Sequence, residues 1–251
     1  MIDDPIFYAL AVPAVALMGL AKGGFSGVGA ISLPLIALVI SPVQAAAILL
    51  PILIVQDVVG VWAFRKTWDR GILAVMLPGA ALGILAGYLL AAQVSSAAVL
   101  GVLGAISILF ASHRLWTARG GRVQAPASAS PVIGGLLGVA SGFTSQIAHA
   151  GQPPFQMYVL PKQLAPASLV GTTAIYFAVI NWLKVPAYAA LGQFTPENLA
   201  TVAVLLPVAI ASTLAGVWLV RRIEAERFYT LIYGLMIPVG AYLIWKAVTG
   251  G

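Results

Sequence analysis

Two polar segments, KGGFSGVG at residues 22–29 and SGFTSQIAHAGQPP at residues 141–154, interrupt an otherwise apolar sequence. Each combines hydroxyl or amide side chains with one larger nitrogen-containing side chain, Lys22 in the first and His149 in the second. Such groups donate hydrogen bonds to anionic oxygens, and glycine lets the backbone approach a ligand closely. The chemistry that these residues predict is the binding of a small anion.

The candidate substrate-binding residues come from these two segments and from one long apolar run. Lys184 lies well inside the run at residues 164–191, where an ionisable side chain is costly in lipid and is functional by default. Pairing with a buried carboxylate is the alternative for Lys184, and snorkelling to the membrane interface is the alternative for Lys22. The full set is Lys22, Gly23, Gly24, Ser26, Gly27, Gly29, Thr144, Ser145, Gln146, His149, Gly151, Gln152, Asn181 and Lys184.

Asp57 and His149 are the candidates for coupling transport to a proton. Asp57 is the one acidic residue inside an expected membrane span, and histidine changes its charge near neutral pH. Neutralisation of a lysine is the alternative for Asp57, and a satisfied core position is the alternative for His149.

The composition is that of an integral membrane protein. Of the 251 residues, 61% are hydrophobic and only 8% are charged, whereas soluble domains carry about 25% charged residues. The absence of cysteine excludes thiolate metal sites, and two histidines are too few for a haem or a histidine-rich metal cluster. We therefore expect no metal, no cofactor and no nucleic-acid partner, and we attribute the net charge of +6 to basic cytoplasmic loops.

The apolar runs follow one order of lengths twice: medium, short, long, long, long. A helix needs about 20 apolar residues to cross a membrane, so the long runs predict full spans and the short ones do not. Asp3 and Asp4 precede the first run where a signal peptide would carry basic residues, so we expect that run to be retained. The runs cover residues 6–21, 30–40, 43–64, 72–92 and 97–112, then 132–148, 155–160, 164–191, 199–220 and 228–245.

Matching residues recur between the two sets of runs. At an offset of 119, Gly19 meets Gly138, Gly23 meets Gly142, Ser26 meets Ser145 and Pro34 meets Pro153; with one residue inserted, Trp62 meets Trp182. These matches predict a first repeat at residues 1–117, a linker at residues 118–131 and a second repeat at residues 132–251, all within one membrane domain.

Loop charges predict that the two repeats have opposite orientations. The basic loop at residues 65–70 corresponds to the neutral loop at 190–198, and the basic loop at 221–227 corresponds to the neutral loop at 91–97. Basic loops stay in the cytoplasm, so the linker would be cytoplasmic and both termini outside. The expected fold is an all-α integral membrane protein with two inverted-topology repeats, each a broken or re-entrant helix pair followed by three transmembrane helices.

Broken helices in corresponding positions of inverted halves point to the substrate site of a transporter. Irregular backbone in a membrane is tolerated only where it is buried in protein or lines a cavity, and the helix that resumes after a break directs free N–H groups towards an anion. We expect alternating access around a site near the midplane. The broken segments and the helices carrying Pro51 and Pro186 would move, and the close-packing Gly79–Gly87 face and its counterpart at 207–216 would be the scaffold.

The chain resembles the sulfite exporter TauE/SafE family, also called the toluene sulfonate uptake permease family, essentially from end to end. The resemblance is carried by GLAKGGFSGVGAISLPL, LPGAALGILAG, ASGFTSQIAHAGQPPFQMYVLP and NWLKVPAYAALGQFT. It implies a multi-pass permease of a prokaryotic inner membrane for sulfite, sulfoacetate, other organosulfonates or thiosulfate, and it fixes neither the substrate nor the direction of transport. The second half lacks the glycine run often found there and carries Gln146, His149 and Gln152 instead, which allows a specialised substrate.

Two other functions fit parts of the sequence. A passive anion channel on the same fold is the first alternative. The second is an intramembrane serine protease, because GFSG contains a G-x-S-G pattern at Ser26 and His149 would serve as its base. Ser26 recurs as Ser145, whereas these segments contain one histidine. A duplicated serine with one histidine suits a symmetric binding site better than a nucleophile paired with its base, so we do not expect an enzyme.

Overall fold

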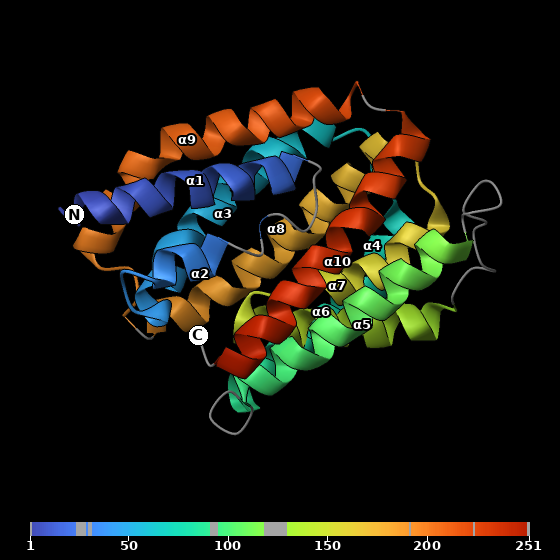
Figure 1. Ribbon diagram of the computed structural model, residues 1–251, viewed down its shortest axis with the longest axis horizontal. Coiled ribbons are helices and arrows are strands. Elements are labelled where there is room, and N and C mark those ends of the chain that lie inside the picture. Colours follow the sequence, from blue (N-terminus) through green and yellow to red (C-terminus); the bar gives the residue numbers. More distant parts are fainter. Residues whose placement is uncertain are drawn as a thin grey trace.

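The computed structural model describes residues 2–23, 29, 32–90, 95–117, 130–190, 192–222 and 224–249, and the regular structure in these ranges is helical. Figure 1 shows the helices as one elongated bundle. The first half contains α1 (Pro5–Gly23), α2 (Ser32–Ala37), α3 (Pro42–Phe64), α4 (Arg70–Leu90) and α5 (Ser96–Thr117). The second half contains α6 (Pro131–Ala148), α7 (Gln152–Val159), the 3-10 turn η3 (Leu160–Lys162), α8 (Pro166–Ala190), α9 (Pro196–Val220) and α10 (Ala225–Thr249).

The structure confirms an all-α integral membrane protein. Among the described residues, six helices are long and apolar enough to cross a membrane. They lie at Pro5–Gly23, Gln44–Phe64, Arg70–Leu90, Pro166–Ala190, Pro196–Val220 and Thr230–Thr249. Helices α5 and α6 contain shorter apolar stretches, Leu100–His113 and Pro131–Ile147, although a full span was expected for α5. By helix length, the order medium, short, long, long, long recurs in both halves.

Several helix starts are encoded by a capping residue followed by proline. Ser41, Ser130 and Thr195 each accept a hydrogen bond from the backbone N–H three residues later, and a proline follows each of them. The cap satisfies one of the free N–H groups of the first turn, and proline at the first helical position removes another without loss. These signals fix where α3, α6 and α9 begin.

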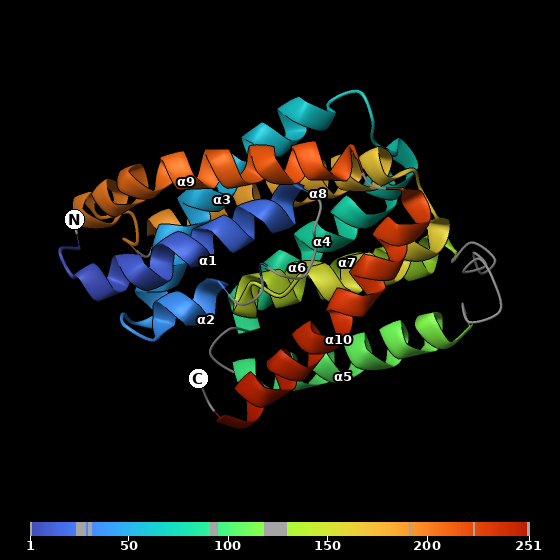
Figure 2. The same cartoon turned by 45° about the horizontal axis from the view of Figure 1, so that its top comes forward.

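The two medium-length helices, α1 and α6, each pack closely against a long helix through glycine residues. A Cβ added at Gly83 of α4 would collide with the carbonyl oxygen of Val139 in α6, and one added at Gly23 of α1 would collide with Gly216 in α9. Close backbone approach of this kind is the usual way in which transmembrane helices associate. The expected close-packing role of Gly79, Gly83 and Gly87 is confirmed, with α6 as the partner helix. Figure 2 shows α1 lying along α9.

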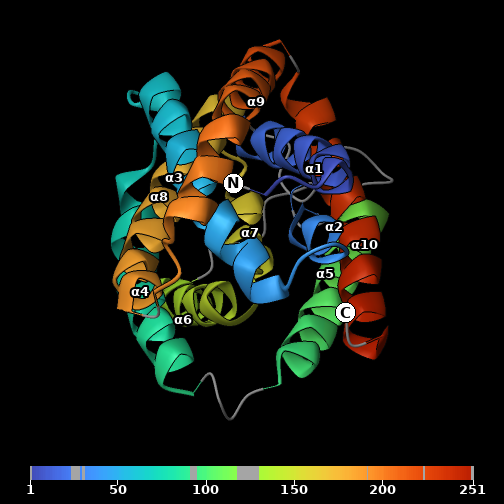
Figure 3. The ribbon, with the colours of Figure 1, turned by 90° about the vertical axis from the view of Figure 1, so that its left-hand side faces the viewer.

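The remaining long helices form two further packed pairs, α3 with α8 and α5 with α10. Helix α3 contacts α8 and α9, and α5 runs antiparallel to α10, with Gly101 near Ala247 and Gly104 near Gly240. Figure 3, viewed along the bundle, shows α7 inside the ring of long helices. Phe155 of α7 stacks on Tyr176 of α8 with ring centroids 4.5 Å apart, which holds this short helix in the core.

The loops divide between the two ends of the bundle according to their charge. The turn after α9 meets the end of α3, where Arg221 donates a hydrogen bond to the carbonyl of Ala63 at 3.0 Å. At the other end, Gln44 donates to Asn198 at 3.2 Å. The labels N and C in Figure 1 lie towards the same end of the bundle. The basic loop at 65–70 and the basic turn at 221–222 therefore share the opposite end.

Candidate functional site

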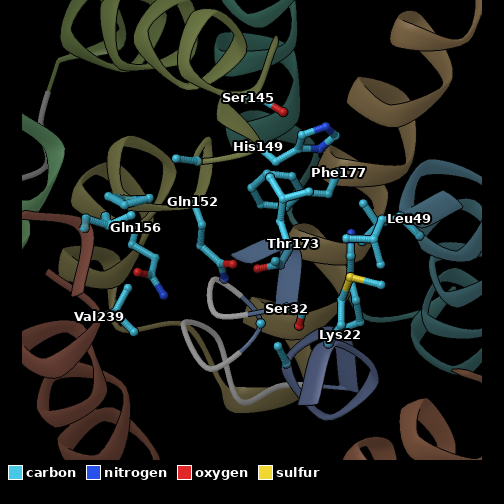
Figure 4. A pocket seen from close by; sticks show the side chains of 18 of the residues that line it. Lys22, Ser32, Leu49, Ser145, His149, Gln152, Gln156, Thr173, Phe177 and Val239 are labelled. Carbon is cyan, nitrogen blue, oxygen red and sulfur yellow. The ribbon is translucent and has the colours of Figure 1, made fainter. Parts of the chain in front are cut away.

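A cavity of about 130 Å³ lies between the two halves, lined by residues from α1, α2, α3, α5, α7, α8 and α10 and from the end of α6. Pockets for drug-sized ligands are larger, at roughly 300–1,000 Å³, so this space suits a small solute. Figure 4 shows Lys22 and Leu49 on one side, Gln152, Gln156 and Val239 on the other, and Ser145 and His149 beside the end of α6.

The first charged cluster of the cavity joins α1, α3 and α8. Lys22 Nζ lies 2.6 Å from Asp57 Oδ1, and Asn181 Nδ2 donates to Asp57 Oδ2 at 2.6 Å. The Asp57 side chain is 1% exposed and that of Lys22 is 15% exposed. Lys22 also lies 5.2 Å from the centre of the Phe177 ring. Both carboxylate oxygens are thus occupied by donors, and Lys22 is held against the cavity wall.

The second cluster lies one helical turn further along α8. Lys184 Nζ donates to Ser145 Oγ at 3.3 Å and lies 3.4 Å from His149 Nδ1. His149 Nε2 lies 2.7 Å from the Tyr188 hydroxyl oxygen. An ammonium group can only donate, so Nδ1 is the acceptor, and a neutral His149 carries its proton on Nε2, from which it donates to Tyr188.

Lys184 differs from Lys22 in making no ion pair with the acidic residues that the structure describes. It is only 1% exposed, yet the ion pairs among the described residues are Lys22–Asp57 and Arg227–Glu224. The groups within hydrogen-bonding distance of Lys184 Nζ in that part of the chain are a hydroxyl and an imidazole. Burying a cation without a counter-charge is costly, so an anion bound beside Lys184 would stabilise its charged form.

The backbone turn at His149 shapes this part of the site. His149 has φ 51°, the left-handed region, and its N–H donates to the Ser145 carbonyl at 3.2 Å. Ser141 Oγ donates to the Gly151 carbonyl at 2.6 Å, and Thr144 Oγ1 donates to the Ala150 carbonyl at 3.1 Å. A non-glycine residue in this region is uncommon and needs such support. The turn directs the His149 ring towards Lys184.

The candidate residues divide into those that line the cavity and those that do not. The cavity is lined by seven of them: Lys22, Gly29, Ser145, His149, Gln152, Asn181 and Lys184. Asp57 contacts the site through Lys22, whereas Thr144 and Gly151 support the turn and Gly23 packs on α9. Gln146 lies in a separate pocket with Tyr88 and Pro186. Gly24, Ser26 and Gly27 lie outside the described residues.

The described helix starts offer few of the free backbone N–H groups that the sequence predicted for anion binding. Helix α7 begins with Gln152, Pro153 and Pro154, and proline has no N–H to donate. Helix α2 has only six residues and therefore a weak dipole. Side chains, above all Lys184, supply most of the positive character of the described site.

Several residues of the cavity were not identified from the sequence. Gln156 follows Gln152 by one turn of α7, a spacing that predicts a shared face once the helix is known. Lys246 is the one lysine near the neutral end of the bundle, which is a signal that it has a local role. Nothing in the sequence distinguishes the others from core residues: Ser32, Thr173, Tyr188 and Tyr242.

A protein-family model described as sulfite exporter TauE/SafE matches residues 11–243. No curated protein and no solved structure matches the chain.

Proposed function

We propose that this chain, which belongs to the sulfite exporter TauE/SafE family, moves small sulfur-containing anions such as sulfite, sulfoacetate or other organosulfonates across the membrane by alternating access. Family membership implies a multi-pass membrane transporter of sulfite or a related anion, and the six apolar helices agree with it. The choice among sulfur-containing anions and the mechanism are our proposals.

The observation that carries the proposal is the environment of Lys184. It is a cavity-lining cation that is 1% exposed, and its polar contacts are neutral. A bound oxyanion supplies the missing negative charge and accepts the hydrogen bonds that Lys184 and its neighbours can donate. The cavity of about 130 Å³ favours a solute the size of sulfite or a short sulfonate.

The Lys22–Asp57 pair supplies a means of releasing the anion. Lys22 is partly exposed to the cavity while Asp57 is buried behind it. An anion that reaches Lys22 competes with Asp57 for the same ammonium group, so binding there is weaker than at Lys184. Strong affinity at both lysines would slow release, and transport needs release as much as binding.

The contacts between helices support two inverted halves. Helix α1 packs on α9 and α6 packs on α4, which are equivalent pairs if α1 matches α6 and α4 matches α9. Helices α3 and α8, and α5 and α10, each pack on their own counterpart. We propose that α1–α9 and α4–α6 move as two rigid units, because their glycine contacts leave no room for sliding. This replaces the expectation that the broken helices move against α4 and α9.

The orientation follows from the same arrangement of loops. The basic loop at 65–70 and the basic turn at 221–222 lie at one end of the bundle, where Arg221 binds the end of α3. We place this end in the cytoplasm of a prokaryotic cell and both termini outside. The cavity, which reaches Lys246 in the last turn of α10, then extends from the middle of the protein towards the outer face.

Counterflow in proteoliposomes tests this function and separates a carrier from a channel. Vesicles loaded with unlabelled sulfite are diluted into radiolabelled sulfite or sulfoacetate. A carrier accumulates label transiently in exchange, whereas a passive channel only equilibrates it. We expect saturable counterflow that Lys184→Met removes and that Lys66→Met, in the exposed basic loop, retains. Equilibration without exchange supports the channel, and the absence of flux for every sulfur anion contradicts the proposed function.

A further inference from the structure

The polar groups that line the cavity fall into two sets according to whether they already have partners. Lys22, Asn181 and Lys184, on α1 and α8, all make hydrogen bonds within the protein. On α7, Gln156 is 4% exposed and its Nε2 has no hydrogen-bond partner among the described residues. The Tyr242 hydroxyl of α10 is buried and likewise lacks a partner in that part of the chain. A buried donor without a partner in a native protein needs an explanation.

Gln156 and Tyr242 lie with two further polar residues, Gln152 and Lys246, along the wall of the cavity that α7 and α10 form. Gln152 and Gln156 are four residues apart on α7, and Tyr242 and Lys246 are four residues apart on α10, so each pair shares one face of its helix. All four line the same cavity as Lys184. Figure 4 places Gln152 and Gln156 beside Val239 of α10 and across the cavity from Lys22 and Leu49.

The chemistry of this wall is that of a second anion subsite. Two amides and a hydroxyl can donate to oxygen, and Lys246 adds a positive charge. Asp57 neutralises Lys22, so among the described residues the formal charges left around the cavity are those of Lys184 on α8 and Lys246 on α10. Two positive charges from different helices around one small cavity match a ligand with two negative groups.

We infer that Gln152, Gln156, Tyr242 and Lys246 form a second subsite for the distal oxyanion of a two-headed substrate whose first oxyanion binds at Lys184. This inference rests on the proposed function for the sulfur chemistry of the first group. The favoured substrate is a short dianion with a sulfonate and a carboxylate, rather than sulfite or a sulfonate with an apolar tail. The second subsite selects chain length and the presence of the second charge.

Equilibrium binding to the purified full-length protein tests the subsite with matched ligands. Sulfoacetate carries a sulfonate and a carboxylate, whereas methanesulfonate carries the sulfonate alone. We expect the wild-type protein to bind sulfoacetate about tenfold more tightly. Gln156→Met and Tyr242→Phe should each reduce sulfoacetate affinity by about fivefold or more and leave methanesulfonate affinity within about twofold. Gln193→Met and Tyr88→Phe are the matched controls, because neither residue lines this cavity.

The outcomes separate this subsite from the proposed function. If Gln156→Met and Tyr242→Phe reduce the affinities for sulfoacetate and methanesulfonate equally, or reduce neither, the second subsite is overturned. Either result leaves the proposed sulfonate transport intact. If no sulfur anion binds, malonate and acetate replace the pair. A preference for malonate that Gln156→Met removes keeps the subsite and contradicts the sulfur substrate. Failure of malonate to bind more tightly than acetate contradicts both proposals.

Discussion

Two lysines of the cavity, the partly exposed Lys22 and the buried Lys184, differ in the groups that surround their charges. Lys22, in the first half of the chain, lies 2.6 Å from the carboxylate of Asp57. Lys184, in the second half, contacts Ser145 and His149 and makes no ion pair in the described part of the chain. The first lysine is therefore largely satisfied by the protein, whereas the second is the one that we propose to bind the substrate anion. One residue type in one cavity thus has two different environments, which are decided by its neighbours.

The difference arises at positions where the two proposed repeats carry different residues. At the offset of 119 the counterpart of Lys22 is Ser141, and at the offset of 120 that aligns the tryptophans the counterpart of Asp57 is Phe177. Ser141 holds the Gly151 carbonyl, and Phe177 lies beside Lys22. Similar helices therefore surround an asymmetric set of charges. The sequence favoured a symmetric site, but the described charges are unequal.

Breaking the Lys22–Asp57 pair should have the largest effect, and that effect is on the free energy of unfolding. We expect Asp57→Ala to lower the free energy of unfolding by about 3 kcal/mol, because it leaves Lys22 without its counter-charge. Glu224→Ala, which breaks the exposed pair with Arg227, should cost at most about 1 kcal/mol. Thermal and denaturant unfolding in detergent measure both. The double variant Lys22→Ala with Asp57→Ala should recover stability, and a double variant as unstable as Asp57→Ala would contradict the pairing.

Removing each lysine separately tests whether Lys184 and Lys22 contribute differently to ligand binding and to stability. Lys184→Ala should weaken binding of a sulfur oxyanion by about 10- to 150-fold, the range for a lost hydrogen bond to a charged group. Its cost in stability should be that of lost packing and two neutral contacts, with no ion pair broken in the described part of the chain. Lys22→Ala should show the opposite balance, with a smaller loss of affinity and a larger loss of stability. Calorimetric titration and unfolding of the two variants measure this, and equal effects at both positions would remove the distinction.

The smallest expected effect comes from Tyr188, which contacts His149 next to Lys184. Tyr188→Phe removes the hydroxyl that lies 2.7 Å from His149 Nε2 and leaves the His149 ring free to turn. We expect affinity for the anion to fall by about fivefold, which corresponds to one neutral hydrogen bond of about 1 kcal/mol. The same titration measures it, with Tyr88→Phe as the control. An unchanged affinity would show that the position of His149 does not depend on Tyr188.

The sequence by itself determined the class of protein and the order of its helices. Runs of about 20 apolar residues with few charges can only be buried in lipid, and the glycine and proline matches marked two similar halves. It also identified Lys22, Ser145, His149 and Lys184, because an ionisable or polar group within an apolar run is conspicuous.

The tertiary structure decided which of these residues meet and which face elsewhere. Successive residues of a helix point about 100° apart, so Ser145 faces the cavity and Gln146 faces a different pocket beside α4. In a helix of a soluble protein, polar residues show which face is exposed to water. Here the lipid and the protein interior are both apolar, so the sequence does not show which face of a helix points inward. Gln156 and Lys246, 90 residues apart in the chain, line one cavity only because α7 and α10 are folded against the same space.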